Sequence, residues 1–319
     1  MQFSQDTLRL LDQVNTIYPG TVLLRANGDA SGVINHDQVS SEVLGSRMAI
    51  EVEDTTAPDF TATHELLHML LALNGYPQLF FQLKVPDDDA LTEQMIVMAT
   101  YLYRPAIHAI IYREQLKHGL LTDAVVSAYV KGVQQELTPE TGDNDNDQMA
   151  LRIMLLLDAK VFLSVVDDTK YQAELAELYP QADASANNIY EAMNIDKITD
   201  AFTLHRAVVA AFTTFDTEMS KHGLPLLNAK EFATLTPVLS ERQMRLTVNQ
   251  VFNIKHVELL DEQTMQPAYI GISKQDEQNS FVLSAPEDEQ KRVEFFKELY
   301  QLSVSELFEQ IKQPFTLRS

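Results

Sequence analysis

The sequence predicts an α+β protein that is predominantly helical. Glycine is scarce, with 10 residues in 319, whereas Leu, Ala, Glu and Gln are abundant. This composition favours helices, because these side chains lose little conformational freedom there and glycine loses the most backbone freedom. Short apolar segments bounded by turn-forming residues occur near both ends of the chain and predict small sheets. A third observation, an H-E-x-x-H motif at residues 64–68, places two histidines on one helix face.

The N-terminal part of the chain, residues 1–120, is predicted to form a core with a small sheet. Residues 3–16 show the pattern of an amphipathic helix. The strand candidates that follow are residues 21–24, 32–35 and 47–52. The third candidate alternates weakly between apolar and polar residues, so we expect an edge or half-buried strand. Such a strand could bind an extended substrate through main-chain hydrogen bonds.

Three helices are predicted in the rest of this core, over residues 59–74, 90–104 and 106–118. Pro58 opens the first helix and Gly75 follows its end. An aspartate-rich loop at residues 86–89 leads into the second helix. Pro105 is expected to stop or kink the second helix, because proline has no N–H to donate and its ring clashes with the preceding turn. The third helix ends at Gly119.

The remaining sequence predicts a helical region, residues 121–225, and a small α+β region, residues 226–319. Helical patterns cover residues 122–137, 147–166 and 187–221, and a boundary is expected within residues 223–245. The later elements are antiparallel strands at residues 255–260, 268–272 and 280–284 and a helix over residues 286–312. Residues 143–147 resemble the start of a calcium loop, but the required glycine is missing and Met154 stands at the twelfth position. That run predicts an exposed loop and helix cap.

Charge and composition exclude several classes of function. The formal net charge of −22 disfavours nucleic acids and anionic membrane surfaces as partners, because both attract basic proteins. The chain has no Cys, so any metal must be held by His, Glu or Asp. The N-terminus lacks the pattern of a signal peptide and no apolar run is long enough to span a membrane. We therefore expect a cytoplasmic protein.

The motif His64-Glu65-Leu66-Leu67-His68 carries the chemistry. Residues four apart lie one helical turn apart on one face, so both imidazoles can bind one metal ion. Glu65 lies beside them, where it can act on water at the metal. This motif is the signature of the zincin metallopeptidases. The metzincin class is excluded, because Leu71 and Asn74 replace the glycine and the third histidine of its longer motif.

A catalytic zinc site needs a third protein ligand. In the gluzincin class, which this sequence resembles, that ligand is a glutamate on a following helix. Glu93, near the start of the second predicted helix of this part, is the favoured candidate. The alternatives are Glu114 and His108 as second choices, then Asp87, Asp88 and Asp89. We expect Zn²⁺ held by His64, His68 and Glu93.

The motif also predicts a mechanism. Zinc lowers the pKa of a bound water, and Glu65 accepts a proton as that water attacks a scissile carbonyl. Gluzincins add a Tyr, His or Arg that stabilises the tetrahedral intermediate. The candidates in the right stretch are Tyr101, Tyr103, Arg104 and His108, and no motif chooses among them.

About a fifth of the chain resembles the compact gluzincin core of the ImmA/IrrE-like metallopeptidases. The resemblance rests on a strand at residues 47–52, the helix T-A-T-H-E-L-L-H-M-L-L, and a Glu-bearing helix that ends at Tyr103-Arg104-Pro105. It implies that the third ligand is a glutamate on the second helix. The alanine-rich stretch of that family is replaced here by Met-Ile-Val-Met-Ala at residues 95–99.

The sequence thus predicts a zinc-dependent metallopeptidase that hydrolyses peptide bonds in a peptide or protein substrate. The alternative is a catalytically silent zincin-like scaffold that binds a protein partner. The intact Glu65 favours the enzyme, because a scaffold has no need of a general base.

Overall fold

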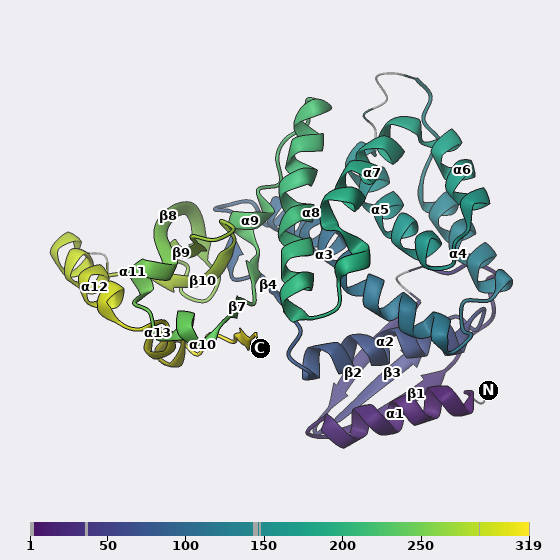
Figure 1. Ribbon diagram of the computed structural model, residues 1–319, viewed down its shortest axis with the longest axis horizontal. Coiled ribbons are helices and arrows are strands. Elements are labelled where there is room, and N and C mark those ends of the chain that lie inside the picture. The colour runs from purple at the N-terminus through teal and green to yellow at the C-terminus, as the bar shows by residue number, and fades with distance from the viewer. Residues whose placement is uncertain (1–2, 36–37, 143–145, 147, 287, 319) are drawn as a thin grey trace. The chain divides into compact units, whose positions relative to one another are not determined.

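The computed structural model describes residues 3–35, 38–142, 146, 148–286 and 288–318. The protein is α+β, mostly helical with small sheets, as predicted (Figure 1). It forms two compact units, each made of two chain segments. The first combines Met1–Asn74 with Arg104–Ile198, and the second combines Gly75–Tyr103 with Thr199–Ser319. This division differs from the expected consecutive regions, residues 1–120, 121–225 and 226–319.

The first unit begins with a small sheet. Its elements are α1 (Gln5–Ile17), β1 (Thr21–Ala26), β2 (Val39–Leu44), β3 (Arg47–Val52), α2 (Pro58–Leu73), the second half of α3 (Asp89–Lys117), α4 (Asp123–Glu136), α5 (Met149–Val165), α6 (Thr169–Leu178), α7 (Pro180–Met193) and the 3-10 helix η1 (Ile195–Lys197). The strand order is β1-β3-β2. The residues of β3 were expected to form an edge or a half-buried strand. The edge is wrong, because β1 pairs with β3 in parallel and β2 pairs with it antiparallel, and the strand is half-buried.

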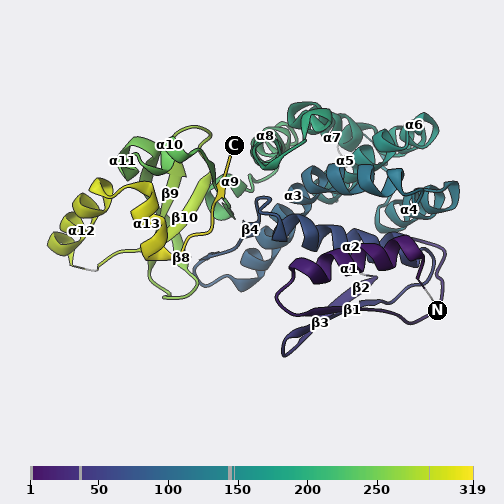
Figure 2. The same ribbon diagram turned by 60° about the horizontal axis from the view of Figure 1, so that its bottom comes forward.

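Helices α1 and α2 lie on the same side of this sheet (Figure 2). Val14 from α1, Val22 from β1, Ile50 from β3 and Leu66 from α2 form a buried cluster between these elements. All four side chains are at most 2% exposed. The sheet therefore supports α2 by burying the side of the helix that carries Leu66.

The strand predicted at residues 32–35 does not form. Gly32 has a positive φ of 83°, which breaks an extended chain. Val33 and Ile34 are buried, and the Ile34 N–H donates to the Ala128 carbonyl of α4 at 3.1 Å. A Cβ at position 132 would lie 2.1 Å from the Ile34 oxygen, so Gly132 is needed for this close approach. The segment packs on a helix, and residues 39–44 supply the strand instead.

Helices α4, α6 and α7 pack against α5. This helix is buried along most of its length, which fits its almost entirely apolar sequence. Of the stop or kink predicted at Pro105, the stop is wrong, since α3 continues from Asp89 to Lys117 with Pro105 inside it. One proline removes a single helical hydrogen bond, and the buried neighbours Leu102 and Ala106 offset this loss by packing.

The helix predicted over residues 187–221 is interrupted. Asn194 has a left-handed conformation that ends α7, and Asp200 forms a capping box with Thr203 that starts the next helix. Residues 169–178, for which no element was predicted, form α6. Most of the predicted loop at residues 143–147 lies outside the described residues.

The second unit is built on a four-stranded sheet. Its elements are β4 (Leu79–Phe80), β5 (Leu83–Lys84), the first half of α3, α8 (Ala201–Lys221), α9 (Ala229–Phe232), β6 (Thr234–Leu235), β7 (Val238–Leu239), α10 (Glu241–Met244), α11 (Val248–Val251), β8 (Phe252–Asp261), β9 (Pro267–Ser273), β10 (Asn279–Ser284), α12 (Glu289–Gln301), α13 (Val304–Ile311) and β11 (Thr316–Leu317). The order β10-β9-β8-β5 confirms the three predicted strands and adds β5 from the earlier segment.

The long C-terminal helix predicted over residues 286–312 is two helices, α12 and α13. Ser303 separates them, because its hydroxyl accepts from the Glu306 N–H and the Glu306 side chain bonds back to the Ser303 backbone. No helix among the described residues combines the length and the apolar character needed to cross a bilayer.

Candidate metal centre

Helix α2 carries the two histidines of the H-E-x-x-H motif. Pro58 occupies its first turn, and the Asp59 carboxylate accepts hydrogen bonds from the Ser4 N–H at 2.8 Å and the Thr7 hydroxyl at 2.5 Å. These contacts tie the start of α2 to α1. The helix ends before Gly75, whose φ of +78° is left-handed. The boundaries agree with the predicted helix over residues 59–74.

Helix α3 brings a third histidine, His108, to the same place. Gln115, two turns after it, is fully buried and donates its amide N–H groups to the Phe60 carbonyl at 2.8 Å and the Thr63 hydroxyl at 2.9 Å. These bonds join α3 to the first turns of α2. The histidines of the two helices are therefore held against one another by hydrogen bonds outside the site.

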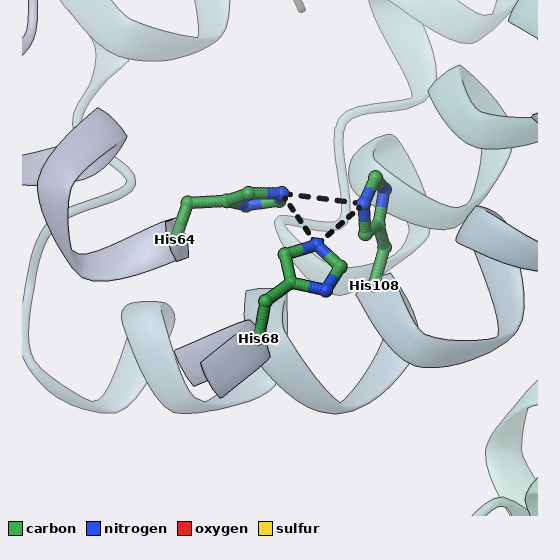
Figure 3. A group of neighbouring side chains, drawn as sticks. All are labelled: His64, His68 and His108. Atoms are coloured by element: carbon green, nitrogen blue, oxygen red, sulfur yellow. Dashed lines mark hydrogen bonds between the residues drawn. The ribbon is translucent and has the colours of Figure 1, made fainter. Parts of the chain in front are cut away.

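The Nε2 atoms of His64, His68 and His108 converge on one point (Figure 3). Each pair of these nitrogens is 3.2 Å apart. His108 is only 1% exposed, and His64 and His68 are partly buried. We call these three residues the histidine cluster. Within the part of the chain that the structure describes, no other group of His, Asp and Glu side chains converges in this way.

Behind His108 lies a buried carboxylate, Asp158 of α5. His108 Nδ1 is 2.6 Å from Asp158 Oδ1, and Asp158 is 3% exposed. The hydroxyls of Tyr112 and Tyr129 donate to Asp158 Oδ2 at 2.9 and 2.6 Å. Burial raises the pKa of both tyrosine hydroxyls well above its ordinary value, and the nearby Asp158 charge adds to the shift. Both tyrosines therefore stay protonated and act as donors.

Aromatic packing on Phe162 of α5 holds the same helices together. Its ring centroid lies 4.1 Å from that of Tyr129, 5.0 Å from that of Tyr112 and 6.2 Å from that of Phe60. The Tyr129 ring is stacked on Phe162 and the other two meet it edge to face. The four helices α2, α3, α4 and α5 are thus packed around the histidine cluster and its carboxylate.

Glu65 follows His64 on α2 and is partly buried. Burial raises the pKa of its carboxyl above the ordinary value, and the positive charges of Arg104 and of a protonated His108 ring oppose that rise in part. The interaction between two charges falls with distance, so an effect of this kind indicates that both side chains lie near the Glu65 carboxyl. The carboxyl of the motif therefore lies in the same partly desolvated region as His108.

Of the residues predicted as the third metal ligand, the structure brings one into the histidine cluster and leaves the others outside it. His108, a second choice, belongs to the histidine cluster, whereas Glu93 is exposed near the start of α3, about four helical turns before His108. Glu114 Oε2 forms an ion pair with Lys117 Nζ at 2.7 Å, and Glu114 Oε1 lies 3.4 Å from His118 Nε2. The three aspartates of the loop, Asp87, Asp88 and Asp89, are exposed in the second unit.

The four residues predicted as candidates for stabilising the tetrahedral intermediate also lie in different places. Tyr103 is buried in the second unit and donates its hydroxyl to the Pro77 carbonyl at 2.8 Å, and Tyr101 belongs to the same unit. Arg104 lies one turn before His108, within electrostatic range of Glu65 and Tyr112. Of the four candidates named from the sequence, His108 is in the cluster and Arg104 is beside it.

Sequence reasoning missed Asp158, Tyr112 and Tyr129. A signal for Asp158 exists, because it interrupts the apolar run Met-Leu-Leu-Leu-Asp-Ala-Lys-Val-Phe-Leu at residues 154–163. A carboxylate in the buried part of a helix must find donors. The sequence does not tell which donors these are, since Tyr112 and Tyr129 come from two other helices.

No family model, curated protein or solved structure matches this chain.

Proposed function

We propose that this protein is a zinc-dependent metallopeptidase, with the metal held by His64, His68 and His108 and with Glu65 as the general base. The single observation that carries the proposal is the convergence of three Nε2 atoms beside the glutamate of an H-E-x-x-H helix. The motif alone supplied two ligands. A third imidazole, from a helix that the motif does not include, completes the set that a catalytic zinc site uses.

The distances within the histidine cluster fit a metal ion. Ligand nitrogens at about 2.0–2.1 Å from a tetrahedral zinc ion are about 3.3–3.4 Å from one another. The three nitrogens of the cluster are 3.2 Å apart in each pair. Three such ligands leave a fourth position for water or substrate.

The chemistry of the donors favours zinc over harder cations. Imidazole suits Zn²⁺, whereas Mg²⁺ and Ca²⁺ prefer oxygen ligands. The cluster offers three imidazoles and no carboxylate. The fold around it supports a zincin-like arrangement, since α2 packs on a small sheet. The third ligand would then be a histidine, where the gluzincin pattern has a glutamate.

The residues of the site suit hydrolysis of a peptide bond. A bound zinc ion supplies Lewis acidity toward water and toward a carbonyl oxygen. The Glu65 carboxylate accepts the proton that the attacking water loses and delivers it to the leaving nitrogen. Burial, which raises the pKa of Glu65, makes it a better proton acceptor than an exposed glutamate. Arg104 provides a positive charge within range of the same region.

The test compares zinc content and peptide cleavage in the wild type, Glu65→Gln and His108→Ala. We expect zinc and cleavage in the wild type, zinc without cleavage in Glu65→Gln, and neither in His108→Ala. Equal absence of cleavage from the wild type and Glu65→Gln over a broad peptide library, with zinc bound, would instead support the silent scaffold. Absence of zinc from the wild type would contradict both the metal site and the enzyme.

A further inference from the structure

The buried carboxylate behind the histidine cluster has a role that the ligands alone do not explain. We propose that Asp158 is a positioning residue of the metal centre, which fixes the ring of His108 so that its Nε2 faces the ion, and that Tyr112 and Tyr129 fix Asp158 in turn. This proposal rests on the proposed function, because it requires a metal at the histidine cluster.

The direction of the hydrogen bonds supports this role. Both tyrosine hydroxyls donate to Asp158 Oδ2, so this carboxylate is an acceptor on that side. Its other oxygen, Oδ1, lies 2.6 Å from His108 Nδ1. An ionised carboxylate can only accept, so with Asp158 ionised the Nδ1–H is the donor. A neutral imidazole has one N–H, so the lone pair of His108 is on Nε2. That atom is the one that faces His64 and His68.

The cost of burying Asp158 points the same way. A carboxylate in an apolar helix core costs free energy, and an apolar side chain would fill the same volume without that cost. Asp158 is 3% exposed and lies between Leu157 and Ala159, both 0% exposed. A divalent cation bound to His108 Nε2 would offset the burial of this negative charge, because the two opposite charges attract each other across the imidazole. The arrangement is the carboxylate–histidine–metal triad that raises the basicity of a ligand.

The two tyrosines make the position of Asp158 rigid. Tyr112 follows His108 by one turn of α3, and Tyr129 comes from α4. Both are at most 5% exposed, and both rings pack on Phe162. Because three helices supply these contacts, neither the carboxylate nor the imidazole can rotate without breaking hydrogen bonds. The histidine is therefore oriented before the metal arrives, which lowers the entropy lost on binding.

The experiment measures zinc affinity by chelator competition, together with the visible absorption of the Co²⁺-loaded protein. Asp158→Asn keeps the shape and removes the charge, and we expect it to weaken zinc binding by about 10–100-fold. Its Co²⁺ spectrum should also change. Asp158→Glu, which restores a carboxylate, should recover part of the affinity.

The matched control is Asp276→Asn in the second unit. Asp276 binds His205 Nε2 at 3.0 Å, so this variant also removes a carboxylate from a buried histidine. It should leave zinc affinity and the Co²⁺ spectrum unchanged. A change equal to that of Asp158→Asn would mean that the effect is one of general stability, and would overturn the proposal.

If Asp158→Asn does not fold, Tyr129→Phe and Tyr112→Phe take its place, since each removes one donor from Asp158 and keeps the ring. We expect a few-fold weaker zinc binding from each. Wild-type affinity in both, or in a folded Asp158→Asn, would sink the role of Asp158. A wild type that binds no zinc would instead contradict the proposed function, so the two failures are distinguishable.

Discussion

Among the residues that the structure describes, two buried histidines each lie against an aspartate, one in each unit. In the first unit, His108 Nδ1 lies 2.6 Å from Asp158 and its Nε2 faces two other imidazoles. In the second unit, His205 Nε2 lies 3.0 Å from Asp276 and its Nδ1 lies 3.2 Å from the Thr236 carbonyl. Both ring nitrogens of His205 therefore meet oxygen acceptors, whereas His108 offers one nitrogen to the histidine cluster.

This difference shows what makes a buried histidine a ligand. Burial and a carboxylate partner are common to both pairs and do not separate them. The surroundings of the second nitrogen do, because a metal site needs several ligand nitrogens that converge on one point. His205 ties α8 to the turn between β6 and β7 and to the turn between β9 and β10. The second nitrogen of His108 instead lies 3.2 Å from two other imidazole nitrogens.

The largest expected effect separates the two histidines directly. His108→Ala should abolish stoichiometric zinc binding and all cleavage, since two imidazoles do not make a catalytic site. His205→Ala should keep zinc at one ion per chain. Zinc content by elemental analysis after dialysis measures both. Retention of zinc by His108→Ala would show that His108 is not a required ligand and that the two histidines do not differ in this respect.

The next effect concerns the group beside the ligands. Glu65→Gln should lower kcat/KM for peptide cleavage by about 10²–10⁴-fold with zinc content unchanged, because it removes a general base. The control is Glu93→Gln, which changes an exposed glutamate on α3 and should leave both quantities at the wild-type level. Loss of zinc from Glu93→Gln would revive the ligand that the gluzincin resemblance implied.

The pair of His205 and Asp276 should affect the pH dependence of folding stability and leave metal binding unchanged. Burial opposes ionisation of Asp276, but hydrogen bonds and the charge of His205, with Ser273 and Gln278, hold its pKa below the ordinary value of 3.8. A lowered pKa stabilises the fold above 3.8, and this stabilisation is lost as the pH falls through the folded value. Asp276→Asn should therefore cost about 1–3 kcal/mol near neutral pH, and less below pH 3.8.

Urea unfolding of the wild type and Asp276→Asn at several pH values measures this difference. A gap that stays constant from neutral pH into strong acid would show that the ionised carboxylate contributes nothing. Zinc affinity, measured on the same samples, should be the same for both proteins.

The smallest effect is expected from Tyr129→Phe, which removes one of the hydroxyl donors to Asp158 and keeps the stacked ring. Loss of one buried hydrogen bond costs about 0.5–1.5 kcal/mol of stability. Thermal unfolding with and without zinc should show a smaller zinc-induced increase in Tm for the variant. An unchanged increase would leave the tyrosine with a packing role alone.

The local features of the site were predictable and the long-range ones were not. Pro58 and Gly75 mark the ends of α2, so the helix and its two histidines followed from nearby residues. The third ligand depends on which turn of α3 lies against α2. Gln115 and the buried face of α3 set that contact, and no spacing rule reveals it. The favoured Glu93 rested on a resemblance, and the chain instead brings His108 to the histidine cluster.

The errors in the fold have the same origin. Pro105 predicts a helix end from local chemistry, but packing on both sides carries α3 through it. The weak alternation at residues 47–52 predicts an edge or a half-buried strand, and the edge is wrong because β1 and β2 pair with both of its sides. By contrast, the strands of the C-terminal sheet follow one another closely along the chain, and their pattern was sufficient.

The interrupted order of the chain affects how the protein emerges from the ribosome. Residues 75–103 leave the ribosome before the first unit is complete, but the second unit closes only after residues 199–319 are made. During that interval Leu83–Lys84 lacks β8, the strand that it pairs with in the finished sheet. A nascent chain with an unsatisfied strand invites wrong partners. No single cut can yield an intact second unit, because its two segments are separated in the sequence. Release of the chain at residue 198 would leave residues 75–103 without residues 199–319, the other segment of that unit.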